Sequence, residues 1–207
     1  ILATLVAMRY CASDGRYFQL RPRALRLGLS YLNSLPFWAA SQRTVETLRD
    51  ETAESCALAV LDETDIVYVQ RWPSRRILTT SLGVGSRLPA HVVSLGRVLL
   101  AAAPAADLDL FFARVNLERL TARTIIDPRL LRRELARIAD LGHAWVDGEL
   151  DPAICGLAVP VRNTRGQVVA ALSINTISGK LTESGARRRF LRPLQQAARD
   201  IQMQMTA

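Results

Sequence analysis

Two histidines and three cysteines are the residues of this sequence with the widest choice of chemistry. His91 and His143 could each act as a general base, and Ser94, Ser173 and Cys155 are nucleophiles that such a base could activate. No Gly-x-Ser-x-Gly motif marks either serine as a nucleophile. Because most chains of this length carry such residues, we assign no catalytic residue. A small-molecule enzyme that uses Cys155 or His143 stays open as an alternative function.

An acidic segment near residue 150 offers a second kind of chemistry. His143, Asp147, Glu149 and Asp151 could hold a metal ion, or Asp147 and Glu149 could act as acid and base, but their spacing matches no standard motif. The loop Gly83-Val84-Gly85 lacks the third glycine and the Gly-Lys ending of phosphate-binding loops. We therefore interpret both segments as loops and expect no metal ion and no cofactor.

Charge points more clearly to a partner. The net charge is +8, and residues 1–35 contain Arg9, Arg16, Arg21, Arg23 and Arg26 with Asp14 as the one acid. A locally basic segment favours a polyanion, most often nucleic acid, although a solvated surface would have the same composition. The run Arg187–Arg189 begins an amphipathic helix and is interpreted as a solvated face.

The composition also bounds the class of protein. Hydrophobic residues make up 49% of the 207-residue chain, which is an ordinary globular balance. The most apolar segment, residues 92–103, is interrupted by Arg97 and is too short to span a membrane. Three widely spaced cysteines fit neither a disulfide framework nor a Cys-x-x-Cys site. The sequence therefore predicts a cytoplasmic protein with no membrane partner.

The first 35 residues have the pattern of the end of a winged helix-turn-helix. Residues 1–8 read as the tail of a helix already under way, so we expect residues upstream of Ile1. Asp14-Gly15 between two apolar runs predicts a hairpin, and Pro22 starts a helix that ends near Asn33. Pro36 then marks a domain boundary. The predicted domains are 1–21 (recognition-helix tail and wing), 22–35 (linker helix) and 36–207.

The remaining residues predict an α+β domain in which helices cover an antiparallel sheet. Charged and turn-forming residues separate the apolar runs of this segment. The predicted helices are 36–54, 91–103, 107–115, 128–141 and 183–205, and the predicted strands are 56–61, 66–71, 76–82, 143–146, 156–163 and 167–175.

Three separated motifs resemble those of the IclR family of bacterial transcription regulators. They are residues 83–101 (GVGSRLPAHVVSLGRVLLA), 121–131 (TARTIIDPRLL), and 147–173, which contains DGELDP, GLAVPVR and GQVVAALS. Residues 10–35 resemble the wing and linker helix of the family. The first motif is most similar to the members that regulate protocatechuate, 4-hydroxybenzoate and β-ketoadipate catabolism.

The resemblance implies a transcriptional regulator with a winged helix-turn-helix, a linker helix and a GAF-like domain that binds a small carboxylic or aromatic acid. Such regulators act on operator DNA as homodimers or homotetramers; a sensor without DNA contact is a further alternative. Most base-reading residues would precede Ile1, which leaves Arg9, Arg16 and Arg21 as the expected DNA contacts. By position in the motifs, the resemblance implies an effector site formed by Ile77, Thr80, Arg87, His91, Ser94, Leu95, Asp147, Ile154, Ser173 and Asn175. Arg97 is expected either to bind the carboxylate or to pair with an acid on a neighbouring strand.

Overall fold

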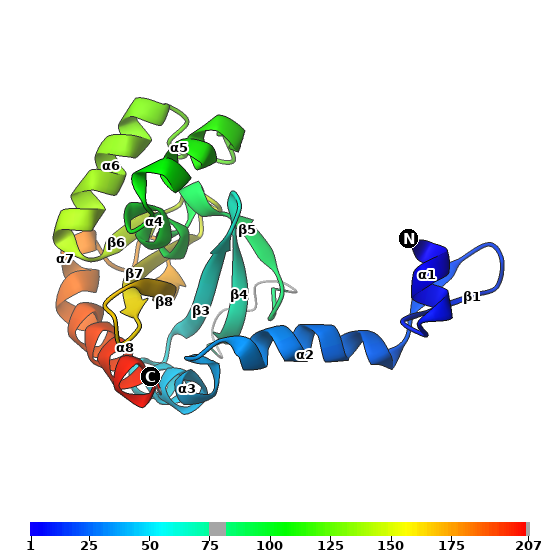
Figure 1. Cartoon of the computed structure of the whole chain (residues 1–207). Coiled ribbons are helices and arrows are strands. Elements are labelled where there is room, and N and C mark those ends of the chain that lie inside the picture. Colours follow the sequence, from blue (N-terminus) through cyan, green and yellow to red (C-terminus); the bar gives the residue numbers. More distant parts are fainter. Residues whose placement is uncertain (75–81, 206–207) are drawn as a thin grey trace. The chain divides into compact units, whose positions relative to one another are not determined.

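A computed structural model describes residues 1–74 and 82–205. The chain divides into two compact units, Ile1–Ala39 and Ala40–Ala207. We call them the N-terminal unit and the sheet unit. Their boundary lies a few residues after the one predicted at Pro36. Figure 1 shows the elements of both.

The N-terminal unit consists of short, locally stabilised elements. Helix α1 (Leu2–Ala7) precedes an antiparallel hairpin of β1 (Cys11–Ser13) and β2 (Phe18–Leu20), and a 3-10 turn (Pro22–Ala24) leads into α2 (Leu25–Ser34). The carboxylate of Asp14 accepts the N–H groups of Tyr17 and Arg16 at 2.7 and 2.9 Å, which lowers its pKa. Gly15 adopts a φ of +92°, a conformation that glycine tolerates best. The predicted hairpin and both predicted helices are confirmed.

Most of α3 (Trp38–Thr52) belongs to the sheet unit, whose described residues form six strands in the order β5-β4-β3-β8-β7-β6, all antiparallel to their neighbours. Their bounds are β3 Ser55–Asp62, β4 Asp65–Trp72, β5 Arg87–Pro89, β6 Ala144–Asp147, β7 Ile154–Arg162 and β8 Val168–Ile177. The predicted antiparallel α+β class is confirmed. The predicted strand 76–82 lies almost entirely outside the described residues.

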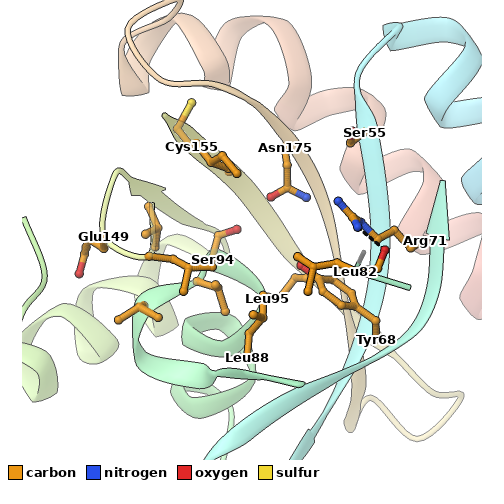
Figure 2. Close-up of a pocket in the computed structure, with 16 residues that line it drawn as sticks. Ser55, Tyr68, Arg71, Leu82, Leu88, Ser94, Leu95, Glu149, Cys155 and Asn175 are labelled. Carbon is orange, nitrogen blue, oxygen red and sulfur yellow. Dashed lines mark hydrogen bonds between the residues drawn. The ribbon is translucent and has the colours of Figure 1, made fainter. Parts of the chain in front are cut away.

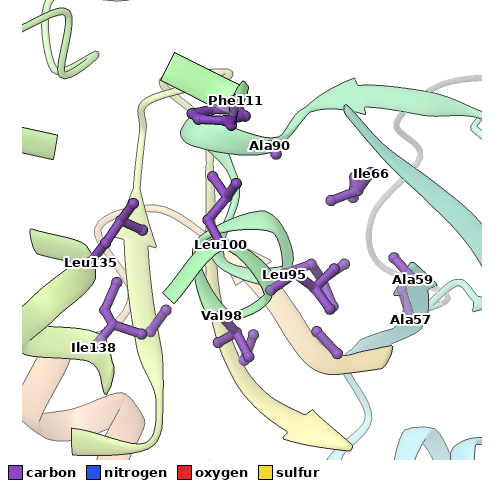
Figure 3. Packing of buried hydrophobic residues seen from close by; sticks show 14 of the residues in the cluster. Ala57, Ala59, Ile66, Ala90, Leu95, Val98, Leu100, Phe111, Leu135 and Ile138 are labelled. Carbon is purple, nitrogen blue, oxygen red and sulfur yellow. The ribbon is translucent and has the colours of Figure 1, made fainter. Parts of the chain in front are cut away.

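Helices cover both faces of this sheet. Helices α4 (Ser94–Ala101), α5 (Ala105–Arg114) and α6 (Pro128–Leu141) lie on one side, and α8 (Arg192–Gln204) packs against β7 and β8 from the other (Figure 1). A buried cluster joins α4, α6 and the sheet through Leu95, Val98, Leu135, Ile138 and Ala57 (Figure 3). This core holds the first turn of α4 in a fixed place over the strands.

Helix α6 has the predicted bounds because its end signals are strong. Asp127 accepts the N–H of Arg129 at 2.7 Å, Pro128 occupies the first turn, and Gly142 ends the helix with a φ of +68°.

Two predicted helices are interrupted. The helix predicted over residues 91–103 is a 3-10 turn (Ala90–Val92), an extended Val93 and then α4. The reason is a close approach, because a Cβ atom at position 96 would overlap the Ala90 carbonyl, and only glycine permits the turn to fold back on α4.

The last helix contains a wider turn. It runs from α7 (Glu183–Ala186) through a π-helical turn (Arg187–Leu191) into α8. Pro193 has no N–H to donate, so the regular hydrogen-bond ladder cannot continue through it. Among the described helices, none is long and apolar enough to cross a membrane.

Candidate functional site

One cavity of the sheet unit lies between the first turn of α4 and strands β3, β4, β7 and β8 (Figure 2). Its volume is about 70 Å³. One water molecule needs about 10–15 Å³ by the same measure, so the space corresponds to about five to seven water-sized groups and suits a compact ligand. Its described lining is mostly apolar, with polar groups from Ser55, Tyr68, Arg71, Ser94, Glu149, Cys155 and Asn175.

The first turn of α4 forms one wall. Val93 precedes the helix in an extended conformation, and Arg97 donates the first intrahelical N–H, to the Val93 carbonyl, at 3.1 Å. The N–H groups of Ser94 and Leu95 therefore have no carbonyl of the helix to donate to. This end of the helix favours an oxygen with negative charge.

A glycine keeps the middle of the cavity open. Gly156 on β7 lies opposite Asn175 on β8. A Cβ atom at Gly156 would lie 2.5 Å from Asn175 Oδ1 and 2.9 Å from Ser94 Oγ. The Asn175 amide donates to Ser173 Oγ at 2.9 Å, which fixes the orientation of the amide. Asn175 and Ser94 thus converge over Gly156 and can both hydrogen-bond a ligand.

Arg71 and Tyr68 form the basic end of the cavity. The Arg71 guanidinium lies 5.7 Å from the centre of the Tyr68 ring and donates to the Leu82 carbonyl. In Figure 2 this guanidinium points toward Asn175. Burial raises the pKa of Tyr68, so the phenol remains a neutral donor. A guanidinium that keeps donors free is a natural partner for a carboxylate.

Glu149 forms the opposite, acidic end (Figure 2). Its Oε2 lies 2.5 Å from Arg97 Nη2 and accepts the Ile125 N–H at 3.1 Å. Arg97 also donates from Nε to the His91 carbonyl at 2.8 Å. Arg97 thus pairs with an acid, as one of the two expectations held, but Glu149 lies in the loop after β6 and not on a strand.

Four of the predicted effector residues line this cavity: Ser94, Leu95, Ile154 and Asn175. Ser173 lies directly beside them through its hydrogen bond to Asn175. Ile77 and Thr80 lie outside the described residues.

Three other predicted residues are not among the lining that the structure describes. Arg87 is exposed and pairs with Asp62 and, at 3.1 Å, with Asp65. The Asp147 carboxylate accepts hydrogen bonds from the Arg123 guanidinium at 2.7 Å and from the Ser178 hydroxyl at 2.6 Å. His91 is buried, and burial together with nearby Arg97 lowers its pKa.

Arg71 was missed by sequence reasoning because a β-bulge changes the face on which it lies. Ala57 and Ala59 are on one face of β3, and their partners on β4 are Arg71 and Tyr68, three residues apart. Strict alternation would put those two side chains on opposite faces. The bulge near Leu58 adds one residue to β4 and brings both into the cavity.

The residues of the alternative enzyme are poorly placed for catalysis. Burial raises the pKa of the Cys155 thiol to about 12, with Asp147 adding to the effect, whereas a nucleophilic thiol needs a lowered pKa. His143 is buried, and its Nδ1 lies 3.0 Å from the Leu141 carbonyl. Among the described residues, no group of three or more His, Cys, Asp or Glu side chains is arranged to hold a metal ion.

The predicted DNA contacts lie in the N-terminal unit. Arg9 follows α1 with a φ of +60°, Arg16 is on the hairpin turn with its guanidinium 5.3 Å from the Tyr17 ring centre, and Arg21 follows β2. All three side chains are exposed.

Residues 29–203 match the family described as bacterial transcriptional regulator IclR C-terminal. The Pca regulon regulatory protein of Pseudomonas putida is 37% identical over 201 residues, which cover 97% of this chain and 69% of that protein.

Solved structures agree with these sequence matches. A putative transcriptional regulator from Rhodococcus sp. RHA1 is 36% identical, with a TM-score of 0.85 over 99% of this chain and 82% of that one. An IclR homolog from Microbacterium hydrocarbonoxydans, solved in complex with 4-hydroxybenzoate, is 25% identical, with a TM-score of 0.83 over 98% of this chain and 82% of that one.

Proposed function

The chain belongs to the IclR family of bacterial transcriptional regulators, and we propose that the cavity beside α4 is its effector site, which binds a small aromatic carboxylic acid. The relatives regulate a Pca regulon and, in one solved complex, hold 4-hydroxybenzoate. The corresponding role for this chain is to sense such an acid and to control catabolic genes.

The observation that carries the proposal is the polarity of the cavity. Its one unneutralised cation, among the lining residues described, is Arg71, and Glu149 at the other end is already paired with Arg97. The effector carboxylate therefore binds Arg71 and Asn175. Ser94 and the first N–H groups of α4 receive a second oxygen, such as a ring hydroxyl. Leu82, Leu88, Val92 and Leu95 enclose the ring.

The regulator acts on operator DNA as a homodimer or homotetramer in the cytoplasm. Arg9, Arg16 and Arg21 contact phosphates, because they are exposed on a unit whose one acid is Asp14. Effector binding shifts the equilibrium between two arrangements of the DNA-binding units. The size of the shift is set by the difference in the effector's affinity for the two arrangements.

A thermal-shift screen with single variants tests the effector site. The ligands are 4-hydroxybenzoate, protocatechuate and β-ketoadipate. An acid at 100 times its Kd should raise the Tm of the wild type by about 5–10 °C, which corresponds to about 2.7 kcal/mol. Arg71→Met should lower the affinity for that acid by about 10- to 100-fold, which is the range expected for the loss of a hydrogen bond to a charged group. The matched control, Arg87→Met, removes an exposed arginine that is not among the described lining residues and should leave the affinity unchanged. No shift with any acid, or equal affinity in the Arg71 variant, would contradict the proposal.

A further inference from the structure

The largest fully buried side chain of the described residues is a charged one, Arg97. It is 2% exposed and lies on α4, whose residues Leu95 and Val98 belong to the hydrophobic core. Its guanidinium reaches the His91 carbonyl, in the turn before α4, and the Glu149 carboxylate, in the loop after β6. It therefore joins two walls of the cavity that are far apart in sequence.

Glu149 is held from several directions. Its residue is 7% exposed, and its Oε2 accepts from both Arg97 and the Ile125 N–H. Its carbonyl accepts the Thr124 hydroxyl at 2.8 Å, and the Thr121 hydroxyl binds the preceding Gly148 carbonyl at 2.6 Å. These contacts hold the Glu149 carboxylate in one position at the acidic end of the cavity, where Arg97 neutralises its charge.

The charge matters because Arg97 and Glu149 are both buried, and salt and water screen buried charges less than exposed ones. An unpaired carboxylate in the cavity wall would repel an anionic ligand, and in protein the interaction of two charges falls off slowly with distance. Pairing with Arg97 cancels that repulsion. Arg71 then decides the charge of the ligand that the cavity accepts.

We propose that Arg97 is a specificity-determining residue, which makes the cavity accept a carboxylate by neutralising Glu149 in its wall. This inference rests on the proposed function. A purely structural role of the Arg97–Glu149 pair leads to a different expectation. Removing either partner would then leave a buried polar group without its partner and would lower the affinity for all ligands alike, charged or neutral.

Two opposite substitutions separate these interpretations, with 4-hydroxybenzoate and its neutral analogue 4-hydroxybenzamide as probes. Arg97→Met leaves this wall of the cavity negatively charged. It should lower the affinity for the acid by about tenfold or more relative to the affinity for the amide. Glu149→Gln leaves the wall positive, and its amide oxygen can still accept from Arg97 and Ile125. This variant should raise the affinity for the acid by up to about tenfold relative to the affinity for the amide. The double variant should return the acid-to-amide ratio to within about threefold of the wild type. Arg87→Met, with its exposed ion pairs, is the matched control and should change neither affinity.

Isothermal titration of the whole chain gives both affinities. Changes of opposite sign in the affinity for the acid in the two single variants, cancelled in the double variant, support the proposal. Equal changes in the affinities for acid and amide, or a lower affinity for the acid in both single variants, would overturn it. If Arg97→Met does not fold, the sign of the Glu149→Gln effect decides by itself. A wild type that binds neither probe nor any other acid would overturn the proposed function and, with it, this inference.

Discussion

The N-terminal unit and the sheet unit hold their shapes by different means. Helices α1 and α2, all of whose residues are described, contain no buried residue, and Leu25, Leu27 and Leu29 on α2 are half or more exposed. In the sheet unit, α4 alone buries seven of its eight residues, including a charged one. One unit is defined by local turns and surface charge, and the other by a core.

This difference predicts different partners. A surface of arginines with one acid suits an extended polyanion, which binds through many exposed contacts and depends on salt. A small cavity built on a rigid core suits a compact ligand held by a few fixed groups. Substitutions should therefore separate stability and effector binding, which we propose for the sheet unit, from DNA binding, which we propose for the N-terminal unit.

The largest effect is expected from the core. Leu135→Ala on α6, where the leucine is 2% exposed, should lower the free energy of unfolding by about 2–5 kcal/mol. Leu29→Ala on α2, where the leucine is 50% exposed, should change it by less than about 0.5 kcal/mol. Urea denaturation followed by circular dichroism measures both. A large loss of stability from Leu29→Ala would contradict this difference between the two units, because it would show that α2 is covered in solution.

A methyl group in the cavity should affect binding more than folding. Gly156→Ala places its Cβ atom against the Asn175 and Ser94 side chains, which can rotate away at the expense of the ligand's hydrogen bonds. Effector affinity should fall by about tenfold or more, the cost of one hydrogen bond. Gly28→Ala on α2 is the control, since no atom lies within 4 Å of its Cβ position. Unchanged affinity in Gly156→Ala would place the effector elsewhere.

Arginine substitutions in the N-terminal unit should act on DNA alone. Arg9→Ala, Arg16→Ala and Arg21→Ala should each reduce the slope of log affinity against log salt by about 1, with effector affinity unchanged. Fluorescence anisotropy with operator DNA at several salt concentrations measures the slope. If the slope stays constant in all three variants, these residues do not contact phosphates.

The smallest effect is a pH dependence of stability from His91. Burial and Arg97 lower its folded-state pKa below the ordinary value of 6.5, so the unfolded chain takes up a proton first as the pH falls. The stabilisation is present above pH 6.5 and is lost as the pH falls toward the folded-state pKa. The Tm of wild type should therefore fall between pH 7 and pH 5, and that of His91→Gln should fall less. Parallel pH profiles of the two proteins would contradict this role of His91.

Local sequence signals predicted the elements better than the site. The bounds of α6 followed from Asp127, Pro128 and Gly142, which act within a few residues of the helix ends. The interruption before α4 was not predicted, because it depends on contact between Gly96 and Ala90 in the folded chain. Among the site residues, Ser94 and Asn175 were placed by resemblance to the family motifs. Arg71 was not predicted, because the bulge on β4 changes the face of the strand on which its side chain lies, and no single residue type in the sequence marks a bulge.

The most direct test of the effector site is a crystal structure of the chain grown with the acid that gives the largest thermal shift. We expect density for the acid in the cavity beside α4, with its carboxylate within hydrogen-bond distance of the Arg71 guanidinium and its ring over Gly156. Density for the acid against Arg87, or anywhere outside this cavity, would contradict the assignment of the cavity beside α4 as the effector site.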